Sequence, residues 1–312
     1  MPRVADDFDL ARIARALGDV PTVVRAEAFV YPASVAAFAG AEGAVRARPS
    51  SDHLRLYVHL PFCNYRCAFC HFATESRADR ARQARYVAAV ERELEWIEPG
   101  TPLSQVFVGG GTPTALDADL LDRVLAAVFA RTRAHGSAVH TVEASPESVT
   151  SAHVAVLQRH GIGRVSLGVQ SLDESVLASV ERRHGRAEAV ETLERLVRAG
   201  FIVNADLMYG LPGQTEASFA AAIDAVAAQG VHSLTLYATR VAPTSRVGRA
   251  VAREARQLDL ARLLAWRALA RDEAERHGFA QVRAHTFKRV GTVADRHTRE
   301  GCHDERVMGL QL

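Results

Sequence analysis

The chain alternates between short apolar stretches and longer segments that carry apolar residues on one helical face. Residues 54–60 (LRLYVHL) place an apolar side chain at every second position, which is the spacing of a β-strand. Residues 82–97 instead repeat apolar residues every three to four positions, as one face of a helix does. Further strands are expected at 105–108, 139–144, 164–168, 202–208, 233–238 and 280–284, and further helices at 117–134, 151–160, 186–199, 217–229 and 258–277.

This alternation predicts an α/β protein built from βαβ units around a parallel sheet. About six units favour a partial (β/α)6 barrel of the TIM type, with its chemistry at the carboxyl ends of the strands. A mixed three-layer sheet also fits, because periodicity does not show whether a sheet closes. Residues 1–50 lack this alternation of strand and helix patterns. They are expected to form an N-terminal extension with a turn at Tyr31-Pro32, ahead of a core domain at 51–312.

Composition and charge narrow the class of protein. Of 312 residues, 48% are hydrophobic and 24% are charged, and the formal net charge is +2. These values are ordinary for a soluble globular protein and give no case for nucleic acid or an acidic membrane as partner. The chain has no run of about 18 apolar residues and no apolar N-terminal stretch, so we expect no membrane span and a cytoplasmic protein. In that compartment four cysteines are not expected to form disulfides.

Three of the four cysteines, Cys63, Cys67 and Cys70, follow the first strand with Cys-x3-Cys-x2-Cys spacing. Thiolates are the normal ligands of [4Fe–4S] clusters, and three thiolates leave one of the four irons open. S-adenosylmethionine can chelate that iron, and an electron from the cluster then cleaves the sulfonium to a 5′-deoxyadenosyl radical. A zinc site with His71 as fourth ligand and buried structural cysteines are the alternatives, and both suit this loop less well.

Four further motifs accompany the cysteine loop and the sequence His-Leu-Pro-Phe ahead of it. They are 109–114 (GGGTPT), 142–147 (VEASPE), 166–171 (SLGVQS) and 206–215 (DLMYGLPGQT). With them the chain, from about residue 31 onward, resembles the radical S-adenosylmethionine (radical SAM) superfamily. The detail is most similar to the branch of oxygen-independent coproporphyrinogen III oxidase and its relatives. The resemblance implies an enzyme in which Cys63, Cys67 and Cys70 hold the cluster and serve catalysis.

The resemblance also implies a site for a first S-adenosylmethionine. Gly110, Gly111 and Thr112 would lie against its methionyl part, since glycine lets a backbone approach a ligand closely. Glu143, at the end of the third strand, would contact the same part of the ligand. A tight strand-to-helix turn and a solvated surface carboxylate are the alternative interpretations of these two features.

A second S-adenosylmethionine is implied by residues that end the next strands. Gln170, Arg182 and Asp206 match positions that contact it, and Tyr57 and Phe69 match aromatics that pack on the two ligands. For Arg182 a solvated basic patch is the alternative, and for the aromatics it is the core. Asp206 is the firmer assignment, because a charge inside an apolar strand is otherwise costly to bury.

One residue just past the loop separates the branches of the family. The oxidase carries a further cysteine two residues after its third cluster ligand, where this chain has Phe72. That difference weakens the case for porphyrinogen decarboxylation. A heme-chaperone branch has an aromatic there but usually an acidic residue before it, where this chain has His71.

A third branch fits the loop and the second ligand set best. Its members use one S-adenosylmethionine for the radical and a second for methyl or methylene transfer to a small unsaturated substrate. We therefore predict that reaction, with oxidase-like decarboxylation or non-catalytic heme transfer as the alternatives. The resemblance further implies a low-potential electron donor of the flavodoxin or ferredoxin type, with heme as a partner under the chaperone alternative.

The last residues depart from the family pattern. Residues 308–312 look like the start of a glycine loop that leads into a substrate-binding domain, so that domain is expected to be absent or truncated. Cys302 and His303 lie just upstream. Cys302 could serve as a radical or proton relay, although a plain exposed thiol is the simpler interpretation.

Overall fold

The computed structural model describes residues 54–134, 138–239, 244–253, 260–292 and 307–310. The N-terminal extension expected at 1–50, with its turn at Tyr31-Pro32, lies outside these residues, as do Cys302 and His303. Within the described part of the chain, no helix combines the length and the apolar character that a membrane crossing requires.

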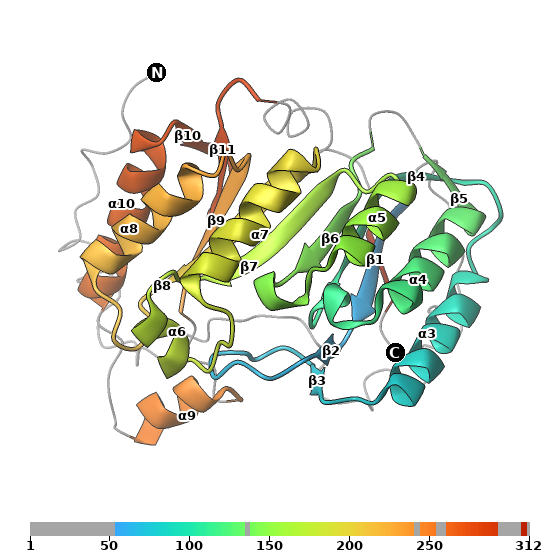
Figure 1. Ribbon diagram of the computed structural model, residues 1–312, viewed down its shortest axis with the longest axis horizontal. Helices are drawn as coiled ribbons and strands as arrows, with labels where there is room; N and C mark the ends of the chain where they lie inside the picture. The colour runs from blue at the N-terminus through green and yellow to red at the C-terminus, as the bar shows by residue number, and fades with distance from the viewer. Residues whose placement is uncertain (1–53, 135–137, 240–243, 254–259, 293–306, 311–312) are drawn as a thin grey trace, which may run out of the picture. The chain divides into compact units, whose positions relative to one another are not determined.

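A sheet with six parallel central strands organises the fold (Figure 1). Along the sheet these strands are β1 (Leu54–Leu60), β4 (Thr101–Gly110), β6 (Thr141–Ala144), β7 (Arg164–Gln170), β8 (Ile202–Tyr209) and β9 (Ser233–Ala238). All neighbours in this series pair in parallel. The α/β architecture and the partial barrel of six strand–helix units predicted from the sequence are therefore confirmed.

Shorter strands extend both sides of this series. On one side β11 (Thr286–Arg289) pairs antiparallel with β9, and β10 (Phe279–Gln281) pairs antiparallel with β11. On the other side β12 (Val307–Leu310) lies parallel beside β1. β5 (Thr132–Ala134) pairs with the start of β4, and the two-residue strands β2 (Phe62–Cys63) and β3 (Glu75–Ser76) form a separate ladder at the cysteine loop.

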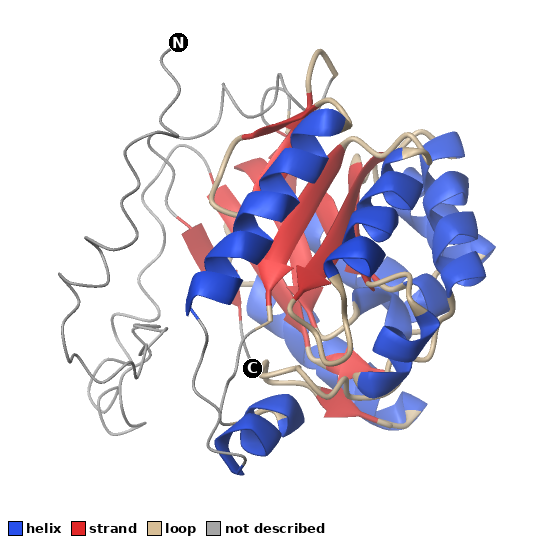
Figure 2. Ribbon diagram, turned by 90° about the vertical axis from the view of Figure 1, so that its left-hand side faces the viewer, coloured by secondary structure: helices blue, strands red, loops and turns tan. Residues whose placement is uncertain are grey.

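The helices line one face of the sheet, as the two ribbon views show together (Figures 1 and 2). They are α3 (Arg80–Leu94), α4 (Ala118–Arg131), α5 (Ser151–Arg159), α7 (Arg186–Arg198), α8 (Glu216–Ala227) and α10 (Leu260–Arg276). Two shorter helices, α6 (Glu174–Ser179) and α9 (Arg246–Arg253), follow the carboxyl ends of β7 and β9. The sequence pattern did not predict these two, because six to eight residues give too few turns for a periodic signal.

Successive side chains of each strand point to opposite faces of the sheet, and one face is apolar while the other is polar. Leu56, Val108, Val142 and Val165 are at most 2% exposed and belong to the main core. The other face is polar: the pairing register places Glu143 beside Ser166, Ser166 beside Asn204, and Asn204 beside Ser233. A sheet that buries apolar residues under helices on one side is left with this polar row on the other.

Helix starts follow local capping chemistry in most places. Thr150 and Thr215 each accept a hydrogen bond from the backbone three residues on, completing a capping box. Asp117 is of a residue type that commonly caps helices. It does precede α4, but its carboxylate makes no capping hydrogen bond and instead pairs with Arg80 of α3. The ion pair between two helices replaces the cap.

Two other expectations are corrected near the C-terminal part of the chain. The strand expected at 280–284 is the first arm of an antiparallel β10–β11 hairpin, and its second arm was not foreseen. Residues 307–310 form strand β12 against β1, where the sequence suggested a glycine loop. β11 pairs with β9 and β12 with β1, both remote in the sequence, and local sequence carries little information about such pairing.

Candidate functional site

The three cysteines of the loop are free thiols that lie at the carboxyl end of β1. The Cys63 Sγ lies 3.7 Å from the Thr112 Oγ1, and the Cys67 Sγ accepts a hydrogen bond from the Arg182 Nη1 at 3.6 Å. Burial, with contributions from the two neighbouring thiols, raises the pKa of Cys63 to about 11. In the metal-free protein this thiol is therefore protonated, and metal binding must release its proton.

The glycine loop is bonded directly to the backbone of the cysteine loop. The Gly111 N–H donates to the Leu60 carbonyl and the Thr112 N–H to the Phe62 carbonyl, both at 2.8 Å. A Cβ on Gly111 would lie 2.5 Å from the Phe62 carbonyl oxygen. Contact this close between two backbones is possible only without a side chain, so the glycine is needed for the two loops to meet.

Glu143 closes the other side of the glycine loop. Its Oε2 accepts a hydrogen bond from the Gly110 N–H at 3.2 Å. Burial raises the pKa of Glu143 to about 7, and the nearby Asp206 charge adds to the shift, while the Gly110 hydrogen bond opposes it. A cationic ligand beside this carboxyl would favour its charged form, so the group is suited to bind a cation.

This raised pKa predicts a pH-dependent stability. The pKa of this carboxyl rises from 4.5 to about 7 on folding. It therefore does not lower the free energy of unfolding below about pH 4.5, lowers it progressively as pH rises toward 7, and lowers it by a constant amount above that. Glu143→Gln cannot ionise, so the metal-free variant should gain stability relative to wild type between pH 5 and pH 8, by at most about 3 kcal/mol. Thermal unfolding across that range measures the effect.

The control for this prediction is Glu188→Gln, which removes one negative charge at an exposed position of α7. It should shift the unfolding midpoint by similar amounts at every pH in the range. Parallel pH curves for wild type and Glu143→Gln would show that Glu143 does not titrate in this way.

Gln170 and Arg182 meet at Gly168, near the end of β7. The Arg182 Nη2 donates to the Gly168 carbonyl, and a Cβ on Gly168 would lie 2.8 Å from the Gln170 Nε2. Gln170 has a φ of +67°, at a bulge in the β7–β8 ladder. Such a φ is uncommon for a residue other than glycine and is frequently found at functional sites. The buried Nε of Arg182 has no hydrogen-bond partner among the described residues.

Asp206 lies further along the polar row. Its Oδ2 accepts from the Ser166 hydroxyl at 3.0 Å, and its Oδ1 accepts from the Asn204 side-chain amide at 2.8 Å. Burial raises its pKa, and Arg164 and the hydrogen bonds oppose that rise. The carboxylate is thus bonded within the sheet, and it influences Glu143 through charge rather than through a shared hydrogen bond.

Tyr57 and Phe69, the aromatic residues expected to pack on the ligands, lie in surroundings that differ from each other. The Tyr57 hydroxyl lies 3.2 Å from the His59 Nδ1, and the Tyr57 ring stacks on Phe107. Phe69 packs against a small apolar cluster that contains Val176 and Met208. Phe72, at the position expected to distinguish the branches of the family, is 55% exposed and stacks on the neighbouring His71 ring.

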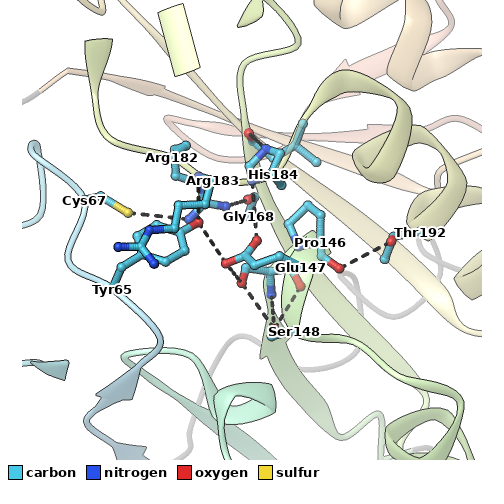
Figure 3. A network of polar contacts seen from close by, with 12 residues as sticks. Tyr65, Cys67, Pro146, Glu147, Ser148, Gly168, Arg182, Arg183, His184 and Thr192 are labelled. Carbon is cyan, nitrogen blue, oxygen red and sulfur yellow. Dashed lines mark hydrogen bonds and ion pairs between the residues drawn. The ribbon is translucent and has the colours of Figure 1, made fainter. Parts of the chain in front are cut away.

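A network beside the cysteines was not predicted from the sequence (Figure 3). Glu147 accepts hydrogen bonds from the hydroxyls of Tyr65 at 2.9 Å and Ser145 at 2.7 Å, and its Oε2 lies 3.4 Å from the His184 Nδ1. Burial opposes ionisation, but His184 and the Arg182 charge lower the pKa of Glu147 to about 2. The available signal was a second glutamate in the 142–147 motif.

The donor set suits a [4Fe–4S] cluster with S-adenosylmethionine better than a single metal ion. Among the described residues, no group of three or more His, Cys, Asp or Glu side chains converges on one point. A cluster places each thiolate on a different iron, so its ligands do not converge in that way. The unpartnered Arg182 Nε is a buried donor that a bound anionic group would satisfy.

Six parallel strand–helix units, with a three-cysteine loop at the carboxyl end of the first strand, define the class of radical SAM proteins. The radical SAM superfamily matches residues 57–226 of this chain, which is more than half of its length. The chain belongs to that superfamily, whose cofactors are a [4Fe–4S] cluster and S-adenosylmethionine.

The relatives lie in the branch that the sequence motifs indicated. The heme chaperone HemW of Mycobacterium tuberculosis is 34% identical over 212 residues, covering 66% of this chain and 53% of the relative. An oxygen-independent coproporphyrinogen III oxidase of Cereibacter sphaeroides is 30% identical over 218 residues, covering 66% and 48%. The chain spans about half the length of these curated relatives.

A solved structure supports the same branch. Coproporphyrinogen III oxidase (HemN) from Escherichia coli, described as a radical SAM enzyme, superimposes with a TM-score of 0.75 at 25% identity. The superposition covers 86% of this chain and 65% of the other.

Proposed function

We propose that this chain holds a [4Fe–4S] cluster at Cys63, Cys67 and Cys70 and uses it to cleave S-adenosylmethionine reductively. The observation that carries the proposal is the loop itself. It holds three free thiols, the Leu60 and Phe62 carbonyls beside it accept hydrogen bonds from the glycine loop, and Cys67 accepts one from Arg182. When bound, the cluster and S-adenosylmethionine supply a 5′-deoxyadenosyl radical.

The residues around the loop bind and orient the ligand. Gly110, Gly111 and Thr112, whose N–H groups are bonded within the protein, lie against its methionyl part, and Glu143 offers a carboxylate to the same end. Tyr57 and Phe69 supply aromatic contact at the edges of the site. Gly110 and Glu143 already share a hydrogen bond, so they act as one preorganised surface.

For the substrate we propose a tetrapyrrole, since the relatives are named for heme and for coproporphyrinogen. The exposed Phe72 ring, stacked on His71, offers a flat apolar surface beside the cysteine loop. Such a surface suits a macrocycle better than a small polar substrate. The proposal has two forms, oxidation of a porphyrinogen and transfer of heme without turnover.

A second candidate is methyl or methylene transfer from a second S-adenosylmethionine. It is supported by the polar residues Gln170 at the end of β7 and Asp206 on β8, together with Arg182, which donates both to the Gly168 carbonyl and to the Cys67 Sγ. The Phe72 position, where a decarboxylating relative would carry a cysteine, supports it as well. We further propose a flavodoxin or ferredoxin as the electron donor for either reaction.

One experiment tests these proposals. Anaerobically reconstituted protein is reduced in the presence of S-adenosylmethionine. The amounts of 5′-deoxyadenosine and S-adenosylhomocysteine are then measured with and without heme or coproporphyrinogen. Formation of 5′-deoxyadenosine supports reductive cleavage, and its absence at full cluster content contradicts it. Simultaneous S-adenosylhomocysteine favours methyl transfer. Stoichiometric heme binding without either product favours a carrier.

A further inference from the structure

Two consecutive residues between α6 and α7, Arg182 and Arg183, contact the cysteine loop from the side of β7. Arg182 donates to the Cys67 Sγ and to the Gly168 carbonyl. The Arg183 N–H donates to the Tyr65 hydroxyl at 3.2 Å, and its guanidinium lies 5.0 Å from the centre of the Tyr65 ring. Tyr65 lies between Cys63 and Cys67 in the sequence. The segment 182–184 therefore contacts the cysteine loop at two points, Cys67 and Tyr65 (Figure 3).

His184 ties the same segment to the strands behind it. Its side chain is fully buried, and its Nε2 lies 3.1 Å from the Val169 carbonyl oxygen. A carbonyl only accepts, so the Nε2 carries a proton. The other ring nitrogen faces the Glu147 carboxylate at 3.4 Å. The ring therefore lies between two fixed acceptors on β7 and on the segment after β6.

Glu147 joins both halves of this arrangement. It accepts the Tyr65 hydroxyl of the cysteine loop on one oxygen and faces the His184 ring with the other. The contact between Glu147 and His184 is an electrostatic approach and not a hydrogen bond. The hydrogen bond from the Tyr65 hydroxyl fixes the carboxylate, because its displacement would leave a part-buried polar group unpaired. Among the described residues the Arg182 side chain makes two hydrogen bonds, to the Cys67 Sγ and to the Gly168 carbonyl, and an arginine side chain loses much rotamer freedom when it is held.

We propose that Tyr65, Glu147 and His184 are positioning residues that hold the Arg182 guanidinium against the Cys67 thiolate, and that they thereby raise the reduction potential of the bound cluster. This inference rests on the proposed cluster at the three cysteines. A charged donor to a cluster thiolate stabilises the reduced, more negative state, since hydrogen bonds to the sulfurs tune the potential. The three residues act on the cluster through Arg182.

The test compares reduction potentials in a double-mutant cycle. Tyr65→Phe removes one hydroxyl without changing charge or bulk, and it breaks the hydrogen bonds with Glu147 and Arg183. We expect reconstituted Tyr65→Phe to have a more negative midpoint potential than wild type. Arg182→Gln should shift it further in the same direction, and adding Tyr65→Phe to Arg182→Gln should change nothing more.

Tyr86→Phe is the matched control. Its hydroxyl donates to the His59 carbonyl at 2.9 Å, so the variant loses one comparable hydrogen bond at β1 without touching residues 182–184. Its potential should equal that of wild type. An unchanged potential in Tyr65→Phe at full iron content would overturn the inference, as would an equal shift in the Arg182→Gln background.

Glu147→Gln provides a second route if Tyr65→Phe does not retain a cluster. The amide still accepts from the Tyr65 hydroxyl but no longer attracts the His184 ring. Loss of a negative charge alone would make the potential more positive, whereas release of Arg182 makes it more negative. A negative shift that disappears in the Arg182→Gln background supports the inference, and a positive shift or none overturns it. Failure of wild type to take up iron and sulfide would instead overturn the proposed function, and the inference with it.

Discussion

Replacing Cys63, Cys67 and Cys70 together by alanine is expected to remove the cluster and reduce 5′-deoxyadenosine formation to background. The three thiols are free and lie on one loop at the carboxyl end of β1. Without them the chain has no set of soft ligands there for four irons. After anaerobic reconstitution the variant should be colourless, with iron and sulfide at the level of a blank, while wild type is brown.

The variant should nevertheless fold, because the three side chains are partly exposed and none belongs to the apolar core. Its thermal unfolding in the metal-free state should resemble that of metal-free wild type. Cys302→Ser is the matched control, since it removes one thiol elsewhere in the sequence and should retain the full cluster content. Persistence of 5′-deoxyadenosine in the triple variant would show that the cluster assignment is wrong.

Alternation of apolar residues predicted the strands well where one face of the sheet meets helices. The strands at Leu54–Leu60 and Ser233–Ala238 begin and end where the pattern placed them. β4 runs from Thr101 to Gly110, longer than the expected 105–108, because its first residues pair with the short β5 as well as β1. That pairing partner is remote in the sequence, so its effect on the length of β4 could not be predicted.

The cysteine spacing and the glycine motif indicated where the chemistry lies, but not what supports it. Tyr65 and Glu147 are 82 positions apart in the sequence, and neither lies in a periodic element. Asp206 illustrates a second limit. A buried charge was expected to be costly without a ligand, yet Ser166 and Asn204 already donate hydrogen bonds to it. Partners on neighbouring strands offset that cost, and only the pairing register reveals them.

Gly111→Ala is expected to abolish most cluster uptake and to destabilise the protein. The added Cβ would lie 2.5 Å from the Phe62 carbonyl oxygen and 2.6 Å from that of Pro61. Both contacts are with backbone, which cannot rotate away as a side-chain end can. The glycine loop and the cysteine loop must therefore separate, at the expense of the hydrogen bonds that Gly111 and Thr112 donate across the gap.

Overpacking of this kind costs about 1–3 kcal/mol, which thermal unfolding of the metal-free protein measures. Iron and sulfide per chain after reconstitution measure the second effect, since Cys63 follows Phe62 directly and moves with it. Gly163→Ala is the control: its Cβ would lie 3.4 Å from the Val139 Cγ1, at the edge of ordinary van der Waals contact, so stability and iron content should stay near wild type. Equal iron content in Gly111→Ala and wild type would mean that contact between the two backbones is not what shapes the cluster loop.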